Sequence, residues 1–562
     1  MDALLKVFSR GGFGIRTMVV LALMGLSFSF LGCGGGGNHG GGATPPVENP
    51  PTPPPPLQKV YTEHLGRLDD TTLNPLADVG LVGHDLGISF ERDGKLIFLF
   101  GDSLAINPAY TNGDSVAWTD ASINPLISDV MPKLEWFLEA PGQFLPVRIP
   151  GANLEAAMNT PVDGVPIGSA TYIFAATGWN GNIGPHGSYT LSALAHTEGL
   201  AFDSLVRDYV TASDKFLNVS VVKDDNTLWI FGSGTYRASA VYLAKVDATR
   251  VTDRNAWSYF SGYQQGKPVF KTSEASATPL VSVGCVGELS VRRHEGLGYL
   301  MAYNCDSPRG VNLRFANQPA GPWSNPTTIF APYADRGYGY FMHQKESAVG
   351  YDDGLSDPGG EDYWGGEYGP YLIPRWMTEE SPGVYSIVYT LSSWNPYRSH
   401  LMRTIVAAPG VYASPPPPRG TDLPPAALVN GDFATGDLTG WQTTGDPFVV
   451  YQGPDGQWRL TTGVAAEGEA WQDFSVDAKT HELRFAVSGG DAASVKLLLL
   501  REGEIVATVR TSRGRRSDTQ ATTVRWLLDD LHGETVRLLI EDHSTDPWGY
   551  VTTTGFSFVQ TP

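Results

Sequence analysis

The sequence has few cysteines and few basic residues for its length. Only three of its 562 residues are cysteine, and no group of His and Cys residues has the spacing of a metal site. Lys and Arg number 39 against 59 Asp and Glu, which gives a formal net charge of −20. An acidic surface argues against nucleic acid or anionic lipid as a partner. We therefore expect no metal cofactor and no nucleic-acid partner.

The chain also lacks a comfortable membrane span near its N-terminus. The apolar run Thr17–Phe30 is too short for one, but it follows three basic residues in the manner of an export signal. The run ends at Phe30-Leu31-Gly32-Cys33, which resembles the lipobox of bacterial lipoproteins. This resemblance implies that residues 1–32 are a signal peptide, that Cys33 is lipidated, and that this lipid is the only membrane contact. Gly34 after the cysteine favours the outer membrane or the cell surface of a Gram-negative bacterium.

Two Pro-rich stretches divide the rest of the chain. Residues 33–58 are rich in Gly and Pro and are typical of a flexible tether. A second Pro-rich linker covers residues 414–426. We therefore expect one unit over residues 59–413 and a smaller one over residues 427–562.

Composition and repeats predict an all-β fold. The 65 Gly, 41 Pro and 62 aromatic residues (24 Tyr, 24 Phe, 14 Trp) favour turns and aromatic strands. In the central unit a hairpin followed by polar residues recurs five times, and in at least four cases a third strand follows. Such repeats predict a five-bladed β-propeller, and a two-sheet sandwich with long insertions is the alternative.

One hairpin brings two acidic residues together. In GHDLGISFERDGKLIFLFGDS, from Gly83 to Ser103, a turn at Asp93-Gly94 makes Asp85 face Asp102. Two facing carboxylates repel each other and destabilise the fold, so a pair of them indicates a functional role. Each aspartate could instead be a strand-end turn residue. A one-residue bulge would break the pairing.

A propeller would gather such strand ends around one funnel. Asp85 and Asp102 come from the first hairpin, Asn218 begins the third and Glu288 the fourth. Cleavage of a glycoside needs one carboxyl group to protonate the leaving oxygen and another to attack or to activate water. The pattern therefore indicates a glycoside hydrolase.

The two remaining cysteines lie at the base of the fourth hairpin. With a turn centred on Glu295-Gly296, Cys285 and Cys305 are one residue out of register. An exported chain meets an oxidising compartment, so we expect a disulfide between them.

Several blocks of the central unit resemble a known family. GHDLGISFERDGKLIFLFGDS, LWIFGSGTYRASAVYLAKV, GELSV, LRFANQPAGPWS and LSSWNPYRSHLMR resemble the domain of unknown function 4185, classed as glycoside hydrolase family 183. The resemblance covers about residues 78–405. It implies a five-bladed propeller, endo-cleavage of D-arabinofuranose chains such as those of mycobacterial arabinogalactan and lipoarabinomannan, and essential roles for Asp85 and Asp102.

Other residues are candidates for the site. Glu288 could support acid–base catalysis or simply pair with an arginine, and Glu155 could replace it. Arg237 could hold substrate hydroxyls or form a structural ion pair, and His343 could line the funnel or be structural. Trp394 and Tyr397 could stack on sugar rings. A structural calcium could bind loop carboxylates in Tyr351–Asp357.

The C-terminal unit is a predicted β-sandwich. It contains alternating strand patterns and resembles the jelly-roll modules of polysaccharide-degrading enzymes, which implies a packing or glycan-binding accessory. We therefore expect a monomeric, surface-anchored endo-glycosidase with Asp85 as nucleophile or base and Asp102 as the acid or as a group that tunes the acid. The alternative is a non-catalytic glycan-binding lipoprotein.

Overall fold

The computed structural model describes residues 51–561 apart from residues 70, 108–112, 129–130, 185, 356–361, 446, 464–466, 490–492, 501–503, 511–520 and 546–548. The signal peptide, Cys33 and most of the tether lie outside the described residues. Within the described part of the chain, no helix is long and apolar enough to cross a membrane.

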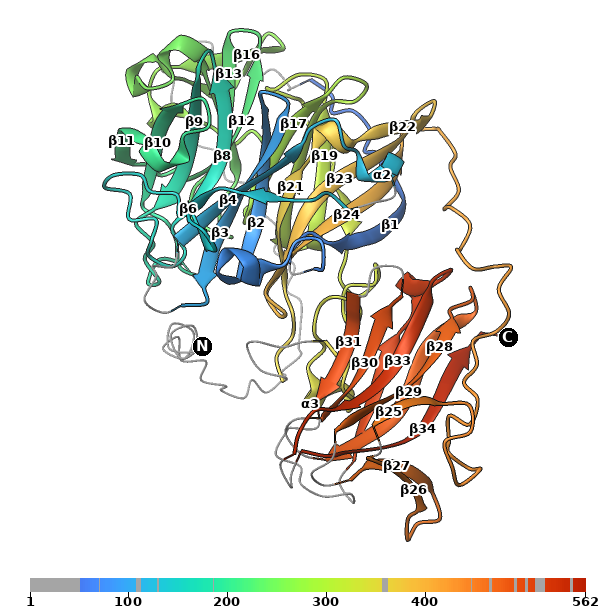
Figure 1. Cartoon of the computed structure of the whole chain (residues 1–562). Helices are drawn as coiled ribbons and strands as arrows, with labels where there is room; N and C mark the ends of the chain where they lie inside the picture. The colour runs from blue at the N-terminus through green and yellow to red at the C-terminus, as the bar shows by residue number, and fades with distance from the viewer. Residues whose placement is uncertain are drawn as a thin grey trace, which may run out of the picture.

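The first unit is built from five antiparallel sheets (Figure 1). The first contains β2 (Leu81–Arg92), β3 (Lys95–Ala105), β4 (Gly113–Asp120) and β5 (Glu135–Trp136). The second contains β8 (Thr160–Ile167), β9 (Ala170–Thr177), β10 (Leu191–Glu198) and β11 (Val206–Ala212). The third contains β12 (Asn218–Asp224), β13 (Thr227–Ser233), β14 (Val241–Asp247), β15 (Ser258–Gln264) and β16 (Lys267–Lys271).

The fourth sheet contains β17 (Leu289–His294), β18 (Gly298–Asp306), β19 (Arg309–Ala316) and β20 (Thr327–Phe330). The fifth contains β21 (Glu367–Leu372), β23 (Val384–Ser393), β24 (Arg398–Ala407) and β1 (Gln58–Arg67), with β22 (Thr378–Ser381) also paired to β23. A small hairpin is formed by β6 (Leu138–Ala140) and β7 (Gln143–Phe144).

Helices are short in this unit and serve as connections. They are α2 (Pro125–Ser128), α3 (Glu346–Val349), η1 (Leu76–Val79), η2 (Phe202–Ser204), η3 (Ala248–Arg250), η4 (Arg254–Ala256), η5 (Glu274–Ser276) and η6 (Pro374–Trp376).

The five sheets are arranged in a closed ring. Their inner strands contact one another in the order β2, β8, β12, β17, β21 and back to β2. We interpret each sheet as one propeller blade. The last sheet joins both ends of the unit, because β1 pairs along its length with β24. The sequence patterns did not predict β1 as a member of this sheet.

Alternating side chains explain why the sheets stack. On β3, Ile97 and Leu99 pack toward the second sheet against residues such as Ile173, whereas Phe98 and Phe100 pack toward the fifth. A strand with apolar residues on both faces must be covered on both sides, as in a sheet between two neighbours. The run KLIFLF therefore fits a blade interior.

A buried ion pair lies between the inner strands. Arg292 on β17 donates from two nitrogens to Asp163 on β8, each at 2.8 Å. Ser220 on β12 and the carbonyl of Ser89 on β2 accept further hydrogen bonds from the same guanidinium. One side chain therefore ties four of the five inner strands together.

The second unit is a β-sandwich of two five-stranded sheets. One contains β25 (Gln442–Gly445), β28 (Gly468–Ser475), β33 (Thr535–Asp542), β30 (Ala493–Leu499) and β31 (Glu504–Arg510). The other contains β26 (Phe448–Gln452), β27 (Trp458–Thr462), β34 (Val551–Gln560), β29 (Thr480–Gly489) and β32 (Thr522–Leu527). One short helix, η7 (Asp529–Leu531), follows β32. The predicted all-β class, with a smaller sandwich after the first unit, is confirmed.

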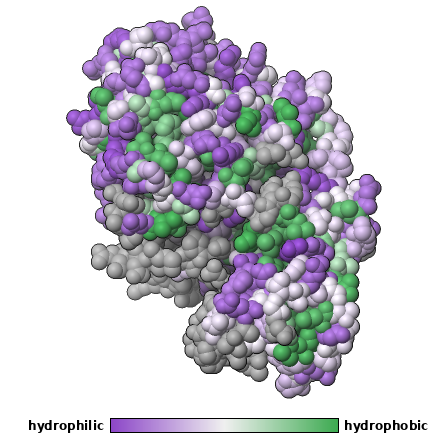
Figure 2. All heavy atoms as spheres, viewed as in Figure 1, coloured by the Kyte–Doolittle hydropathy of each residue, from purple (hydrophilic) through white to green (hydrophobic). Residues whose placement is uncertain are grey.

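The surface in the view of Figure 2 is mixed. Hydrophilic residues predominate over the first unit on this face, and apolar residues gather in smaller patches on both units. This distribution agrees with an acidic chain whose apolar residues mostly fill the spaces between sheets.

Candidate active site

A cavity of about 450 Å³ opens where the inner strands begin. Each of the five sheets contributes to its lining from the start of its inner strand, through Asp85 (β2), Thr160 (β8), Asn218 (β12), Glu288 (just before β17) and Tyr368 (β21). The convergence expected of a propeller funnel is therefore present.

The first hairpin departs from the predicted register. Pairing follows the prediction from Arg92↔Lys95 to Ile88↔Leu99, but a bulge then places Asp85 opposite Gly101, not Asp102. The bulge falls at Leu86 and Gly87, whose φ angles are 67° and 95°.

Contacts with the fifth sheet account for this bulge. The amide of Leu86 donates to Ser392 Oγ at 2.8 Å, and a Cβ on Gly87 would meet Thr390 at 3.1 Å. The prediction that Asp85 faces Asp102 was therefore wrong in register. Even so, both carboxyl groups line the same cavity.

Asp85 is buried and forms no ion pair with a cation among the described residues. It is 8% exposed, and Tyr368 Oη donates to its Oδ2 at 2.9 Å. Burial raises the pKa of Asp85 well above its usual value, and the charge of Asp102 raises it further. The Tyr368 hydrogen bond opposes this shift, because it stabilises the ionised carboxylate.

Asp102 is held in a strained backbone conformation. Its φ angle is 34°, and the amide of Met158 donates to both of its carboxyl oxygens, at 2.9 and 3.1 Å. Burial raises the pKa of Asp102 to about 6, while the Met158 hydrogen bonds lower it. Strain of this kind in a cavity is a feature of functional sites.

A third carboxyl group, missed by sequence analysis, lies behind the pair. Asp114 on β4 is fully buried and accepts a hydrogen bond from the amide of Asp102 at 3.1 Å. Burial raises its pKa well above the usual value, as do the charges of Asp102 and Asp85. The signal was in the chain, because Gly113-Asp114-Ser115 repeats Gly101-Asp102-Ser103.

Glu288 lies on another wall of the cavity. It is buried, and its Oε1 accepts a hydrogen bond of 2.5 Å from Tyr236 Oη. Arg237 follows in an αL-like conformation with φ 52°, and its guanidinium lies 5.2 Å from the Tyr236 ring centroid. Burial lowers the pKa of Arg237, but the neighbouring Tyr236 and Glu288 outweigh this effect and raise it.

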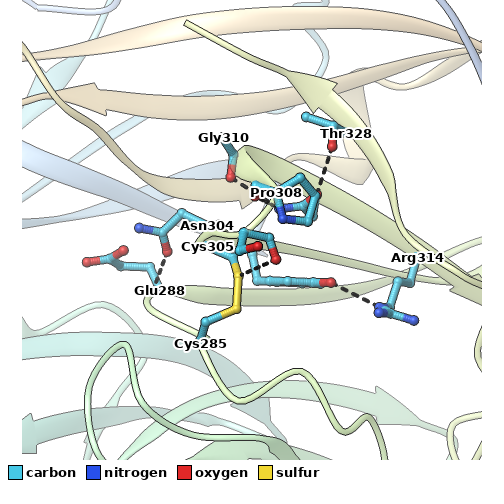
Figure 3. The surroundings of a disulfide bond; sticks show 11 residues. Cys285, Glu288, Asn304, Cys305, Pro308, Gly310, Arg314 and Thr328 are labelled. Carbon is cyan, nitrogen blue, oxygen red and sulfur yellow. Dashed lines mark hydrogen bonds between the residues drawn. A yellow bond between two sulfur atoms is a disulfide. The ribbon is translucent and has the colours of Figure 1, made fainter. Parts of the chain in front are cut away.

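The disulfide fixes the segment that carries Glu288. Cys285 and Cys305 are bonded, with Cα atoms 5.4 Å apart, and Figure 3 shows Glu288 and Asn304 beside this bond. Asn304 Oδ1 accepts a hydrogen bond of 2.7 Å from the amide of Glu288. The hairpin pairs Leu289 with Tyr303, so its connection is one residue longer than predicted.

Aromatic side chains complete the lining. The predicted Trp394 and Tyr397 both lie there, and Tyr397 Oη donates to the carbonyl of Asp102 at 3.2 Å. Sequence analysis missed the other aromatic members of the lining, which are Tyr189, Tyr236, Tyr368 and Tyr371.

The three other predicted residues differ in how they lie relative to the cavity. Asn218 lines the cavity and donates from Nδ2 to the carbonyl of Gly287 at 3.3 Å. Glu155 also lines it, but it forms an exposed ion pair of 3.0 Å with Arg148. His343 is absent from the described lining, because it is buried beside Asp353 with Nδ1 3.1 Å from a carboxyl oxygen.

Among the described residues, no group of three metal-ligating side chains lies together in this cavity. In the proposed calcium loop, Asp353 accepts hydrogen bonds from the amides of Gln344 and Leu355, and residues 356–357 lie outside the described residues. Two groups with metal-ligating side chains occur in the sandwich, namely His481, Asp529 and His532, and Glu469, Glu541 and His543. Both nitrogens of His481 already contact protein oxygens, so we assign no metal there.

Comparisons with known proteins place the chain in a family. No curated protein matches its sequence. Among solved structures, exo-β-1,3-galactanase from Phanerochaete chrysosporium is 11% identical with a TM-score of 0.37, covering 83% of this chain and 95% of that one. A family 43 arabinoxylan arabinofuranohydrolase from Bacillus subtilis is 11% identical with a TM-score of 0.32, covering 89% and 99%.

Similarities at that level define neither the activity nor the site residues of this chain. The amino-acid sequence itself matches one family model over residues 71–403, which is more than half of the chain. The chain belongs to the family described as "Domain of unknown function (DUF4185)".

Proposed function

We propose that the protein is an endo-acting glycoside hydrolase for arabinofuranose-containing polysaccharide. The observation that supports this most strongly is the pair Asp85 and Asp102, a buried and a half-buried carboxyl group with raised pKa values in one cavity. Carboxyl groups whose surroundings separate their proton affinities are suited to acid and base roles.

The surroundings of the two groups suggest their roles. Asp85, whose pKa is raised by burial and also by the charge of Asp102, donates its proton to the glycosidic oxygen, which leaves as an alcohol. Asp102, with a pKa of about 6, is ionised near neutral pH and either attacks the anomeric carbon or takes a proton from the attacking water. This assignment reverses the one favoured by the sequence.

The other walls bind the sugar in this proposal. Arg237 and Glu288 supply polar groups for hydroxyls, and Trp394 offers an aromatic face for a sugar ring. The arabinofuranose assignment rests on the family resemblance of the sequence blocks. Lipidation of Cys33 and the Gly/Pro-rich tether would hold the enzyme at the cell surface while it reaches polymer.

The test is a digest of a polysaccharide panel. A soluble form starting at residue 34 is incubated with mycobacterial arabinogalactan and other arabinans, and the products are sized. We expect oligosaccharides from the wild type and none from Asp85→Asn or Asp102→Asn. Binding without cleavage across the panel would favour the glycan-binding lipoprotein instead.

A further inference from the structure

The segment between β20 and β21 connects the sandwich to the cavity wall. On one side, the amide of Asp352 donates to the carbonyl of Thr523 at 3.0 Å, and its carbonyl accepts from the amide of Arg525 at 2.9 Å. The carbonyl of Gly354 accepts from the amide of Thr508 at 2.8 Å. Figure 1 shows α3 of this segment beside the sandwich.

These contacts fall on the edges of both sandwich sheets. Thr523 and Arg525 belong to β32, and Thr508 belongs to β31, the last strand of the other sheet. An edge strand presents unpaired amides and carbonyls, which proteins cover or block. The first unit therefore supplies part of the cover for the sandwich.

The fit at this contact is tight at Gly354. Its φ is 74°, and a Cβ there would lie 1.7 Å from Nε1 of Trp526, a side chain that is only 1% exposed. Nearby, the guanidinium of Arg525 lies 4.3 Å from the ring centroid of Tyr351. Tyr340 Oη also donates to Asp529 Oδ2 of the sandwich at 2.8 Å.

The same segment is bonded to the cavity wall on its other side. Asp353, between the two residues that hold the sandwich, lies against His343 at 3.1 Å, and both side chains are buried. The backbone of His343 donates to the carbonyl of Asn395 and accepts from the amide of Gly365, each at 2.9 Å.

The residues next to Gly365 and Asn395 form the wall of the cavity. The amide of Trp394 donates to the carbonyl of Gly366 at 2.8 Å, and both residues line the cavity. Tyr368, two positions after Gly366, donates a hydrogen bond to Asp85. A continuous series of bonded groups therefore runs from the sandwich edge to the acid of the proposed mechanism.

We propose that the β-sandwich positions the active site through this segment: by holding Gly354 it fixes the Asp353–His343 pair, which in turn holds the cavity wall. The sandwich is then part of the catalytic unit and not only an appended module. His343 is a positioning residue that acts from behind the wall. The effect on activity rests on the proposed function, whereas the effect on the wall does not.

Two glycines of the segment give a matched test in the full chain. Gly354→Ala places a methyl group against Trp526, whereas Gly350→Ala has a similar φ of 78° and open space around its Cβ. For each variant, hydrogen exchange is measured at residues 522–527, which report the contact, and at 362–372, which report the wall. Values of kcat and KM are measured on the cleaved polysaccharide.

We expect Gly354→Ala to raise exchange in both regions and to lower kcat by about tenfold or more, because small displacements of positioned groups are costly in catalysis. Gly350→Ala should match the wild type in all three measurements. Asp353→Asn should raise exchange at the wall and lower kcat while the contact at 522–527 stays protected.

Loss of protection at 522–527 in Gly354→Ala, with unchanged exchange at 362–372 and unchanged kcat, would overturn the proposal. If Gly354→Ala leaves the contact at 522–527 intact, Asp353→Asn becomes the test. Unchanged exchange at 362–372 together with an unchanged kcat in Asp353→Asn would then overturn the proposal. A wild type that cleaves no glycan would refute the proposed function alone, since exchange at the wall still tests the positioning role.

Discussion

Two sets of carboxyl groups in the first two sheets have opposite surroundings. Asp163 is bonded by both terminal nitrogens of Arg292, by Ser220 Oγ and by the amide of Val221. Asp85 and Asp102 form no ion pair with any residue that the structure describes.

This difference separates structural groups from functional ones. A buried carboxylate without a cation costs folding free energy, so a fold optimised for stability alone would pair or replace it. The pair Asp163–Arg292 ties inner strands together, whereas the unpaired carboxyl groups at the strand ends keep protons available for chemistry.

The largest expected effect comes from neutralising the unpaired set. Asp85→Asn and Asp102→Asn should each lower kcat by a factor of about a thousand, because each removes a group that moves a proton or attacks carbon. Product release from the polysaccharide measures this. Asp163→Asn, assayed under conditions where it is folded, is the matched control and should retain most of the activity. An equal loss of kcat in this control would show that the paired and unpaired carboxyl groups do not differ in function.

Breaking the paired set should act on stability. Arg292→Met leaves Asp163 buried without its cation, and we expect a loss of about 3–5 kcal/mol in the free energy of unfolding, measured with urea. The double variant Asp163→Asn/Arg292→Met should recover much of this loss, since no charge then remains unpaired. If Arg292→Met is as stable as the wild type, the ion pair does not stabilise the contacts between the inner strands.

The pH profile sharpens the assignment of roles. The acid limb of kcat/KM should fall below about pH 6, where Asp102 gains a proton. Tyr368→Phe removes a hydrogen bond that lowers the pKa of Asp85, so the alkaline limb should move to higher pH, with a loss of about tenfold in kcat/KM. An alkaline limb that moves to lower pH would contradict Asp85 as the acid.

The smallest effect is expected at Asp114. Burial and the charges of Asp102 and Asp85 raise its pKa, which favours the neutral form, and an amide oxygen can still accept the hydrogen bond from the amide of Asp102. Asp114→Asn should therefore change kcat by less than about threefold and leave the acid limb in place. A loss as large as that of Asp102→Asn would move Asp114 into the catalytic set.

Local signals predicted much of this architecture. The Asp93-Gly94 turn fixed the pairing of its hairpin as far as Ile88↔Leu99, and the two cysteines lie where the hairpin base placed them. Strand alternation and turn residues act over a few positions, so they can be read from the chain directly.

The rest depends on partners far away in sequence. The bulge at Leu86 needs Ser392 of the last sheet, and β1 joins that same sheet across more than 300 residues. The sequence left open whether His343 lines the cavity or is structural, and contacts with Asp353 and the sandwich edge decide its position. Such contacts leave no periodic pattern in the sequence.

The most direct test of the central claim is a carboxyl titration. With Asp labelled by ¹³C at Cγ and resonances assigned by Asp85→Asn and Asp102→Asn, NMR follows each group against pH. The account predicts that Asp102 titrates near pH 6 and that Asp85, whose pKa burial and the charge of Asp102 raise, titrates well above the range of ordinary aspartates. Titration of both groups at about pH 4, as for ordinary aspartates, would contradict it.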